Sequence, residues 1–132
     1  MTAVACPVAL HPGGMPRRIP VYLRADGQLQ LVYSDMPSDA HPDAIAARAL
    51  HSQSGLETRA ALSIGTSDAV QSGILWHFSL CRIIPPVRDH WAHLPPDGSG
   101  LRKFHWLPFD ESAPAPLSEP SHQAIAWLRA TL

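Results

Sequence analysis

Apolar and polar residues alternate along several short runs of this chain, which is the pattern of half-buried β-strands. Two such runs flank Asp26-Gly27, a dipeptide typical of tight turns, and predict a hairpin over residues 18–34. In the later run "ILWHFSLCRII", large apolar residues alternate with histidine, serine and cysteine, so one face is strongly apolar and the other mixed. This run, residues 74–84, is joined by a polar loop to a predicted strand over 57–65, and a last strand is predicted over 101–109.

Two segments predict helices. Residues 42–55 are alanine-rich, start at a proline, which fits the first helical turn, and end at a glycine, a common C-terminal stop. Residues 121–132 place Ile125, Leu128 and Leu132 on one side of an amphipathic helix. The expected order is β-β-α-β-β-β-α. Because this is not a strict βαβ alternation, we expect an α/β (α+β) fold with a mixed β-sheet packed between helices.

The other segments are rich in proline, glycine and polar residues. Residues 1–16 contain three prolines and a Gly-Gly pair and predict a loose N-terminal arm or an irregular first strand. Loops are expected over 34–42 and 87–100, and residues 110–120 are expected to link the last strand to the C-terminal helix. The length of 132 residues suits a single domain over 1–132.

Composition narrows the class of protein. Hydrophobic residues make up 45% of the chain, enough for a packed core, and the formal net charge of −1 without a basic block argues against nucleic-acid binding. Cys6 and Cys81 are the only cysteines, which we expect to be reduced thiols. The chain shows neither a signal-peptide pattern nor an apolar run of the ~20 residues needed to cross a bilayer. We therefore expect a soluble cytoplasmic protein that does not bind membranes.

The first predicted helix has a recognisable frame. Arg48 is preceded by two alanines and followed at the second position by Leu50, and Gly55-Leu56 closes the segment. This frame resembles the signature helix of the Nudix superfamily of diphosphate hydrolases, G-x5-E-x7-R-E-U-x-E-E-x-G-U, where U is a bulky aliphatic residue. The likeness continues through "WHFSLCRI" and the ending "WLPF", and it covers roughly residues 17–132.

The departures from this motif concern its acids. The four motif glutamates fall on Ala40, Ala49, Ser52 and Gln53, and its first glycine falls on Ser34. In the family the glutamates hold Mg²⁺ or Mn²⁺, hard cations that need oxygen ligands. The segment before the helix is also short, where the family has a further strand and a Gly-rich turn. The resemblance therefore implies a Nudix-like protein with a degenerate catalytic box, without catalytic residues and without a bound metal or other cofactor.

Three functions follow from this resemblance. The favoured one is a non-hydrolytic protein that binds a nucleotide-like or other small ligand, or that serves as an interaction module. The second is an active hydrolase of a nucleoside-diphosphate-linked substrate, with Mg²⁺ or Mn²⁺ held by displaced acids such as Asp35, Asp39, Asp89 or Asp97. The third is a structural or homodimerising protein whose cleft is filled by side chains. Whether the chain is an enzyme stays open at this point.

The sequence offers five candidate ligand contacts, which do not form a motif together. The motif arginine lacks its glutamate partner and so can pair with another acid or contact a phosphate. A tryptophan in the expected loop 87–100 is the better ring-stacking candidate, since Trp76 and Trp106 are expected in the core. Two strand histidines are expected to line a partly polar cavity, and a strand lysine, expected at a solvated strand edge, can also meet an anion. The candidates are Arg48, His77, Trp91, Lys103 and His105.

Histidines raise one further possibility. His90 and His93 lie three residues apart in the expected loop, and a transition-metal site would need at least three histidines to converge. We expect hydrogen-bonded histidines instead, and no metal site. Arg102, beside Lys103, is expected at a solvated strand edge, where it can also meet an anion.

Overall fold

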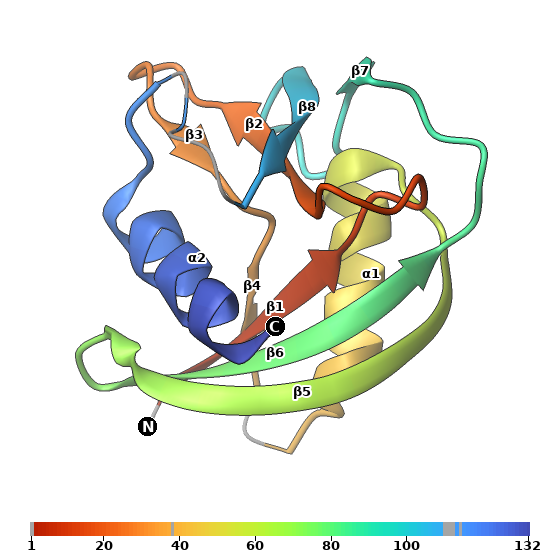
Figure 1. Cartoon of the computed structure of the whole chain (residues 1–132). Helices are drawn as coiled ribbons and strands as arrows, with labels where there is room; N and C mark the ends of the chain where they lie inside the picture. The colour runs from red at the N-terminus through yellow and green to blue at the C-terminus, as the bar shows by residue number, and fades with distance from the viewer. Residues whose placement is uncertain (1, 38, 110–112, 114) are drawn as a thin grey trace.

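A computed structural model of the chain, which describes residues 2–37, 39–109, 113 and 115–132, has eight strands and two helices in these residues (Figure 1). The strands are β1 (Thr2–Ala9), β2 (Arg18–Leu23), β3 (Leu29–Gln30), β4 (Ser34–Met36), β5 (Thr58–Gln71), β6 (Ile74–Ile83), β7 (His90–His93) and β8 (Arg102–Pro108), and the helices are α1 (Pro42–Ser54) and α2 (Glu119–Thr131). Sheet A has the order β4-β1-β6-β5, and sheet B has the order β3-β2-β8-β7.

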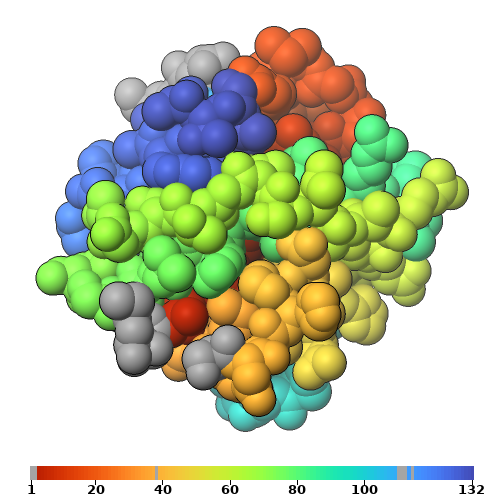
Figure 2. All heavy atoms as spheres, turned by 90° about the horizontal axis from the view of Figure 1, so that it is seen from below, coloured from red at the N-terminus to blue at the C-terminus, as the bar shows by residue number. Residues whose placement is uncertain are grey.

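Sheet A is mixed, as expected, because β1 runs parallel to β6 while its other pairs are antiparallel. Both faces of β6 are covered by helices. Phe78 stacks on Trp127 of α2, with ring centroids 4.2 Å apart, whereas the next residue, Ser79, donates a hydrogen bond of 2.6 Å to Asp43 of α1. The mixed face of the β6 alternation is therefore buried against α1, and sheet A lies between the two helices. Seen from below, β5 and β6 form a green band between α2 and the start of α1 (Figure 2).

The first helix is confirmed in position and in both end signals. Pro42 occupies its first turn, and Gly55 follows its last residue in the left-handed conformation, with φ of 79°. The Gly55 N–H donates to the His51 carbonyl at 2.8 Å, which satisfies one of the free carbonyls at the helix end. The second helix begins at Glu119, two residues before its expected start.

Of the two expectations for residues 1–16, the first half follows the alternative of a first strand, and the loose arm is wrong there. Residues 3–9 are buried in β1, which lies in the interior of sheet A between β4 and β6. Pro7 misled the prediction, because proline is unfavourable inside a sheet. The shorter strand β4 pairs only with Ala3, Val4 and Ala5, so Pro7 lies beyond its end, where a missing N–H need not break a ladder.

Several expected loops contain strands. β4 lies within 34–42, so a further strand does stand between the hairpin and α1, and β7 lies within 87–100. The loop expected after residue 65 is mostly strand, since β5 continues to Gln71. Conversely, the second arm of the hairpin shortens to the two residues of β3. In the expected linker 110–120, residues 110–112 and 114 lie outside the described residues.

Two of the three apolar clusters in the described residues join the helices to sheet B, and the third packs Ala46 of α1 against β1 and β4. One joins α2 to both sheets and contains Phe78, Leu107 and Ile125. The other joins α1 to the inner face of sheet B and contains Leu50 and Phe104. The two cysteines are free and buried, and burial raises the pKa of both thiols, that of Cys81 to about 11. No helix in the described residues is long and apolar enough to span a bilayer.

The cluster under α1 makes a prediction about stability. Leu50 is fully buried there, and replacing it with alanine removes apolar contacts and leaves a cavity. We expect Leu50→Ala to lower the free energy of unfolding by about 2–5 kcal/mol in urea denaturation. Leu62→Ala is the matched control on β5, where the leucine is 66% exposed and the expected change is within about 0.5 kcal/mol. Equal losses in both variants would contradict the assigned position of α1.

Candidate functional site

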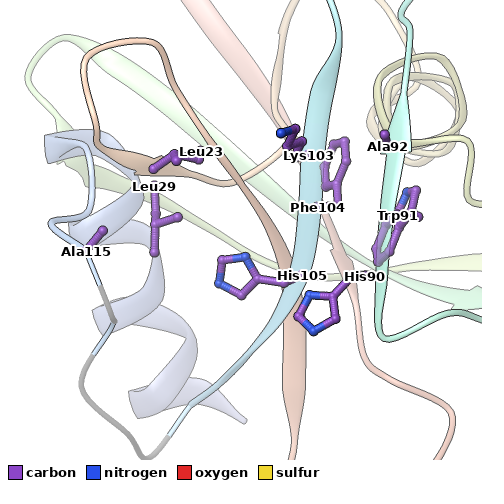
Figure 3. A pocket seen from close by; sticks show the side chains of 9 residues that line it. All are labelled: Leu23, Leu29, His90, Trp91, Ala92, Lys103, Phe104, His105 and Ala115. Carbon is purple, nitrogen blue, oxygen red and sulfur yellow. The ribbon is translucent and has the colours of Figure 1, made fainter.

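Three of the five predicted contacts lie together. Trp91, Lys103 and His105 line a pocket of about 510 Å³ on sheet B, which we call the histidine pocket (Figure 3). Arg48 and His77 do not line it. Arg48 is exposed on α1, and His77 lies half-buried on β6, two residues before Ser79, which faces α1. The five predicted residues therefore do not form one site.

The register of β7 and β8 builds one wall of the histidine pocket. His90 pairs with His105 and Ala92 pairs with Lys103, so these side chains share one face of the sheet. This is the face turned away from α1. The opposite wall is apolar, and its side chains come from the β2–β3 hairpin and the segment before α2 (Figure 3). They are Leu23, Leu29 and Ala115.

Trp91 lies in a strand rather than in a loop. Its ring stacks on Phe104, with centroids 5.1 Å apart and planes 9° apart, and its Nε1 donates a hydrogen bond of 2.7 Å to the Ser54 carbonyl. The residue therefore anchors the end of α1, in addition to lining the pocket. Trp76 and Trp106 are buried in the core, as expected.

The pocket histidines differ from the expected hydrogen-bonded set. Nε2 of His105 is buried without a hydrogen-bond partner among the described residues. Burial lowers the pKa of His105 below 6.5, and the neighbouring His90 lowers it further. No three His, Cys, Asp or Glu side chains gather to hold a metal ion in the part of the chain that the structure describes. His93 instead places its Nε2 3.0 Å from the Ser52 carbonyl oxygen.

A second pocket lies at the helix motif, on the face of sheet B turned toward α1. Gln53, at the last motif-acid position, donates from Nε2 to the Tyr33 carbonyl at 3.1 Å. Its Oε1 accepts a hydrogen bond of 2.8 Å from the guanidinium of Arg102. That guanidinium also lies 4.5 Å from the centroid of the Tyr22 ring and donates to Ser99 at 3.2 Å. The guanidinium of Arg102 therefore lies next to Gln53, where the motif has a metal-binding glutamate.

The space beside Arg102 is a polar pocket of about 470 Å³, which we call the arginine pocket. Arg24 brings a second guanidinium, which forms an exposed ion pair of 3.1 Å with Asp26 and donates to Gln30 at 3.1 Å. Gln30 in turn donates to the Tyr22 hydroxyl at 2.9 Å, so the polar groups form one connected network. The lining residues are Tyr22, Leu23, Arg24, Ala25, Gln30, Tyr33, Ser99, Leu101 and Arg102.

The donor set at the motif does not fit Mg²⁺ or Mn²⁺. Ala49 is packed in the apolar cluster under α1, Ser52 and Gln53 are neutral, and the nearby guanidinium of Arg102 repels a divalent cation. The displaced acids considered above join no group of three potential ligands in the described residues. They are Asp35, Asp39, Asp89 and Asp97.

The arginine pocket was largely missed in the sequence. Arg102 was expected at a solvated strand edge, but it contacts three described side chains, of Gln53, Ser99 and Tyr22. Tyr22, Arg24 and Gln30 were treated only as parts of a hairpin. A usable signal was present, since Tyr22 and Arg24 alternate with Leu23 and therefore lie on one face of the chain as it leaves β2.

No protein-family model matches this chain, and no curated protein is similar to it in sequence. Solved structures are similar over nearly its whole length. An ADP-ribose pyrophosphatase from Streptococcus suis matches with a TM-score of 0.69 and 14% identity, covering 99% of this chain and 92% of its own. A MutT structure, from work on Aliivibrio salmonicida and Vibrio cholerae, matches with a TM-score of 0.70 and 11% identity, covering 99% and 98%.

This chain has the Nudix fold. A third structure, the NUDIX domain of Shewanella oneidensis NrtR complexed with ADP ribose, matches with a TM-score of 0.69 and 11% identity, covering 97% of this chain and 86% of its own. The expected fold class is thereby confirmed. At these identities the likeness establishes the Nudix fold, and the chemistry of this chain has to be argued from its own residues.

The histidine pocket makes a prediction about pH. Because the folded pKa of His105 is lowered, the unfolded chain binds a proton more readily, and stability is lost as the pH falls through 6.5 toward the folded pKa. We expect His105→Gln to show a smaller loss of unfolding free energy than the wild type between about pH 7.5 and 5.5. His105→Gln keeps part of the pH-dependent loss of unfolding free energy, because burial and Arg18 also lower the pKa of His11. Urea denaturation at a series of pH values measures this slope, and an unchanged slope would contradict the assignment.

Proposed function

We propose that this protein binds a nucleotide-like anion in the arginine pocket without a divalent metal, and that it does not hydrolyse it. The observation that carries this proposal is the hydrogen bond of 2.8 Å between Arg102 and Gln53. In the motif, a carboxylate and its metal ion neutralise the diphosphate. Here the carboxylate is replaced by a neutral amide, and the positive charge is supplied by a guanidinium.

The guanidinium groups suit a phosphate ligand. Arginine presents a planar fork of donors that matches the oxygens of a phosphate, and it stays charged at all physiological pH values. Arg102 is held in place by Gln53, Ser99 and the ring of Tyr22, so little side-chain freedom is lost on binding. Arg24 lines the same pocket and adds a second positive group. Two guanidinium groups can contact adjacent phosphates of a diphosphate.

The tyrosines give the pocket a place for a ring. Tyr22 and Tyr33 both line it. The ring of Tyr22 is buried with the guanidinium of Arg102 over its face, so the half-buried Tyr33 is the ring on which a base can stack. The volume of about 470 Å³ falls in the range of small-molecule sites, which is roughly 300–1,000 Å³. The NUDIX domain of NrtR in complex with ADP ribose has the same fold, which makes a ligand of this class a reasonable first choice for a binding test.

Binding without metal is the direct test. We expect ADP-ribose, ADP or inorganic pyrophosphate to bind in isothermal titration with EDTA present, and Arg102→Met to weaken binding about 10- to 100-fold through loss of charge-assisted hydrogen bonds. Arg59→Met, at an exposed position on β5, is the matched control and should bind like the wild type. Circular dichroism checks that both variants fold.

Two outcomes would overturn the proposal. Binding that appears only with Mg²⁺ or Mn²⁺, together with release of hydrolysis products, would favour the hydrolase with displaced acids. No binding of any of the three probes to the folded wild-type protein would also reject it, and it would favour the structural or interaction role.

A second variant changes charge while keeping shape. Gln53→Glu places a carboxylate against the guanidinium of Arg102, where the two form an ion pair. We expect this variant to bind the anion about tenfold more weakly, because the guanidinium is neutralised, and to gain no metal-dependent hydrolysis. Gln123→Glu makes the same charge change at an exposed position on α2 and should leave the affinity unchanged. Unaltered affinity in Gln53→Glu would mean that the anion binds away from Arg102.

A further inference from the structure

The two pockets lie on opposite faces of sheet B and differ in chemistry. The arginine pocket faces α1 and is lined mainly by polar groups, including two guanidinium groups. The histidine pocket faces away from α1, and no arginine is among its lining residues in the described part of the chain. Leu23, at the end of β2, lies at the border and lines both. A ligand that suits one pocket therefore does not suit the other.

The apolar wall of the histidine pocket can hold a ring. Leu23 is 52% exposed and pairs across the hairpin with Leu29, which is buried, so the two side chains form one apolar surface. Ala115 continues this wall on the segment before α2, and the rings of Trp91 and Phe104 belong to strands on the opposite side (Figure 3). The volume of about 510 Å³ admits a bicyclic aromatic body.

The polar groups of this pocket suit a single negative charge. Lys103 is exposed on β8 and supplies one full positive charge, and His105 offers a buried Nε2 without a partner in the described residues. A buried polar atom without a partner is unfavourable, and a turn of the His105 ring toward the pocket brings this atom to a ligand oxygen. Asp89 lines an adjoining pocket of about 270 Å³ together with Arg18 and both histidines. Among the described residues that line the two pockets, Lys103 and Arg18 therefore outweigh the single negative charge of Asp89.

We propose that the histidine pocket binds an aromatic monocarboxylate, with the ring against Leu23 and Leu29 and the carboxylate beside Lys103 and His105. The single charge of Lys103 matches one carboxylate, whereas a diphosphate needs the denser positive charge of the arginine pocket. The two walls of the pocket differ: the hairpin side is apolar and the β7–β8 side is basic. This difference orients the ligand across the sheet. This site is independent of the function proposed above.

The test uses 1-naphthoate and its neutral analogue 1-naphthalenemethanol as probes in isothermal titration of the whole chain. We expect the wild type to bind one molecule of 1-naphthoate and to prefer it to the alcohol. Leu23→Glu should weaken 1-naphthoate binding at least about tenfold, because it places a negative charge on the apolar wall. Leu62→Glu makes the same change at an exposed leucine of β5 and should bind like the wild type.

Two further variants identify the charge and the pocket. Lys103→Met should weaken 1-naphthoate binding about tenfold and abolish the preference over the alcohol, while binding of the alcohol is retained. Arg102→Met should leave 1-naphthoate binding unchanged, because Arg102 lies on the other face of the sheet. It is the variant expected to lose the nucleotide-like anion, so failure of one proposal is distinguishable from failure of the other.

The proposal is rejected by any of three results. In the first, titration shows that the wild type binds 1-naphthoate with a Kd no lower than about 1 mM. Alternatively, Leu23→Glu, shown to be folded by circular dichroism, binds it like Leu62→Glu. In the third case, Arg102→Met removes binding, which places the aromatic anion in the arginine pocket instead.

Discussion

Burial of both faces of β6 is the constraint from which the rest of this structure follows. Phe78 must be covered by α2 and Ser79 by α1, so the two helices are placed on opposite sides of sheet A. Once α1 is fixed there, its other side packs on sheet B through Leu50. Its last turns then lie beside β8, where Gln53 meets Arg102, and beside β7, where Trp91 caps the Ser54 carbonyl. Both pockets are thus built on a sheet whose position depends on this packing.

A second constraint is electrostatic. A Nudix-type metal site needs several carboxylates near one another, and their mutual repulsion is relieved only by the cation. In this chain the helix offers Ala49, Ser52 and Gln53 instead, and a guanidinium lies against Gln53. The local charge is therefore reversed relative to the motif while the fold is kept. This reversal disfavours divalent cations at the same place, and it is the basis for our proposal that the site binds an anion directly.

The parts predicted correctly from sequence are those specified by local patterns. The first helix was predictable because Pro42 and Gly55 act within their own turns, and β6 because its alternation is long and strong. β7 was missed and β1 was predicted only as one of two alternatives, since a four-residue edge strand or a strand in the sheet interior is defined by its partners more than by its own residues. Trp91, Lys103 and His105 were found as chemically suitable residues, and their convergence depended on the β7–β8 register. The Arg102–Gln53 contact spans 49 residues, and no local pattern encodes it.

We propose that Arg102 replaces a metal ion as the positive group at the motif. The most direct measurement is the ¹H–¹⁵N NMR signal of the Arg102 guanidinium, assigned with Arg102→Met, during titration with inorganic pyrophosphate in EDTA. We expect this signal to shift saturably and the titration to be the same when Mg²⁺ replaces EDTA, after allowance for binding of Mg²⁺ to free pyrophosphate. A signal that stays fixed in EDTA and shifts only with Mg²⁺ would show that the anion needs the metal ion and that Arg102 does not replace it.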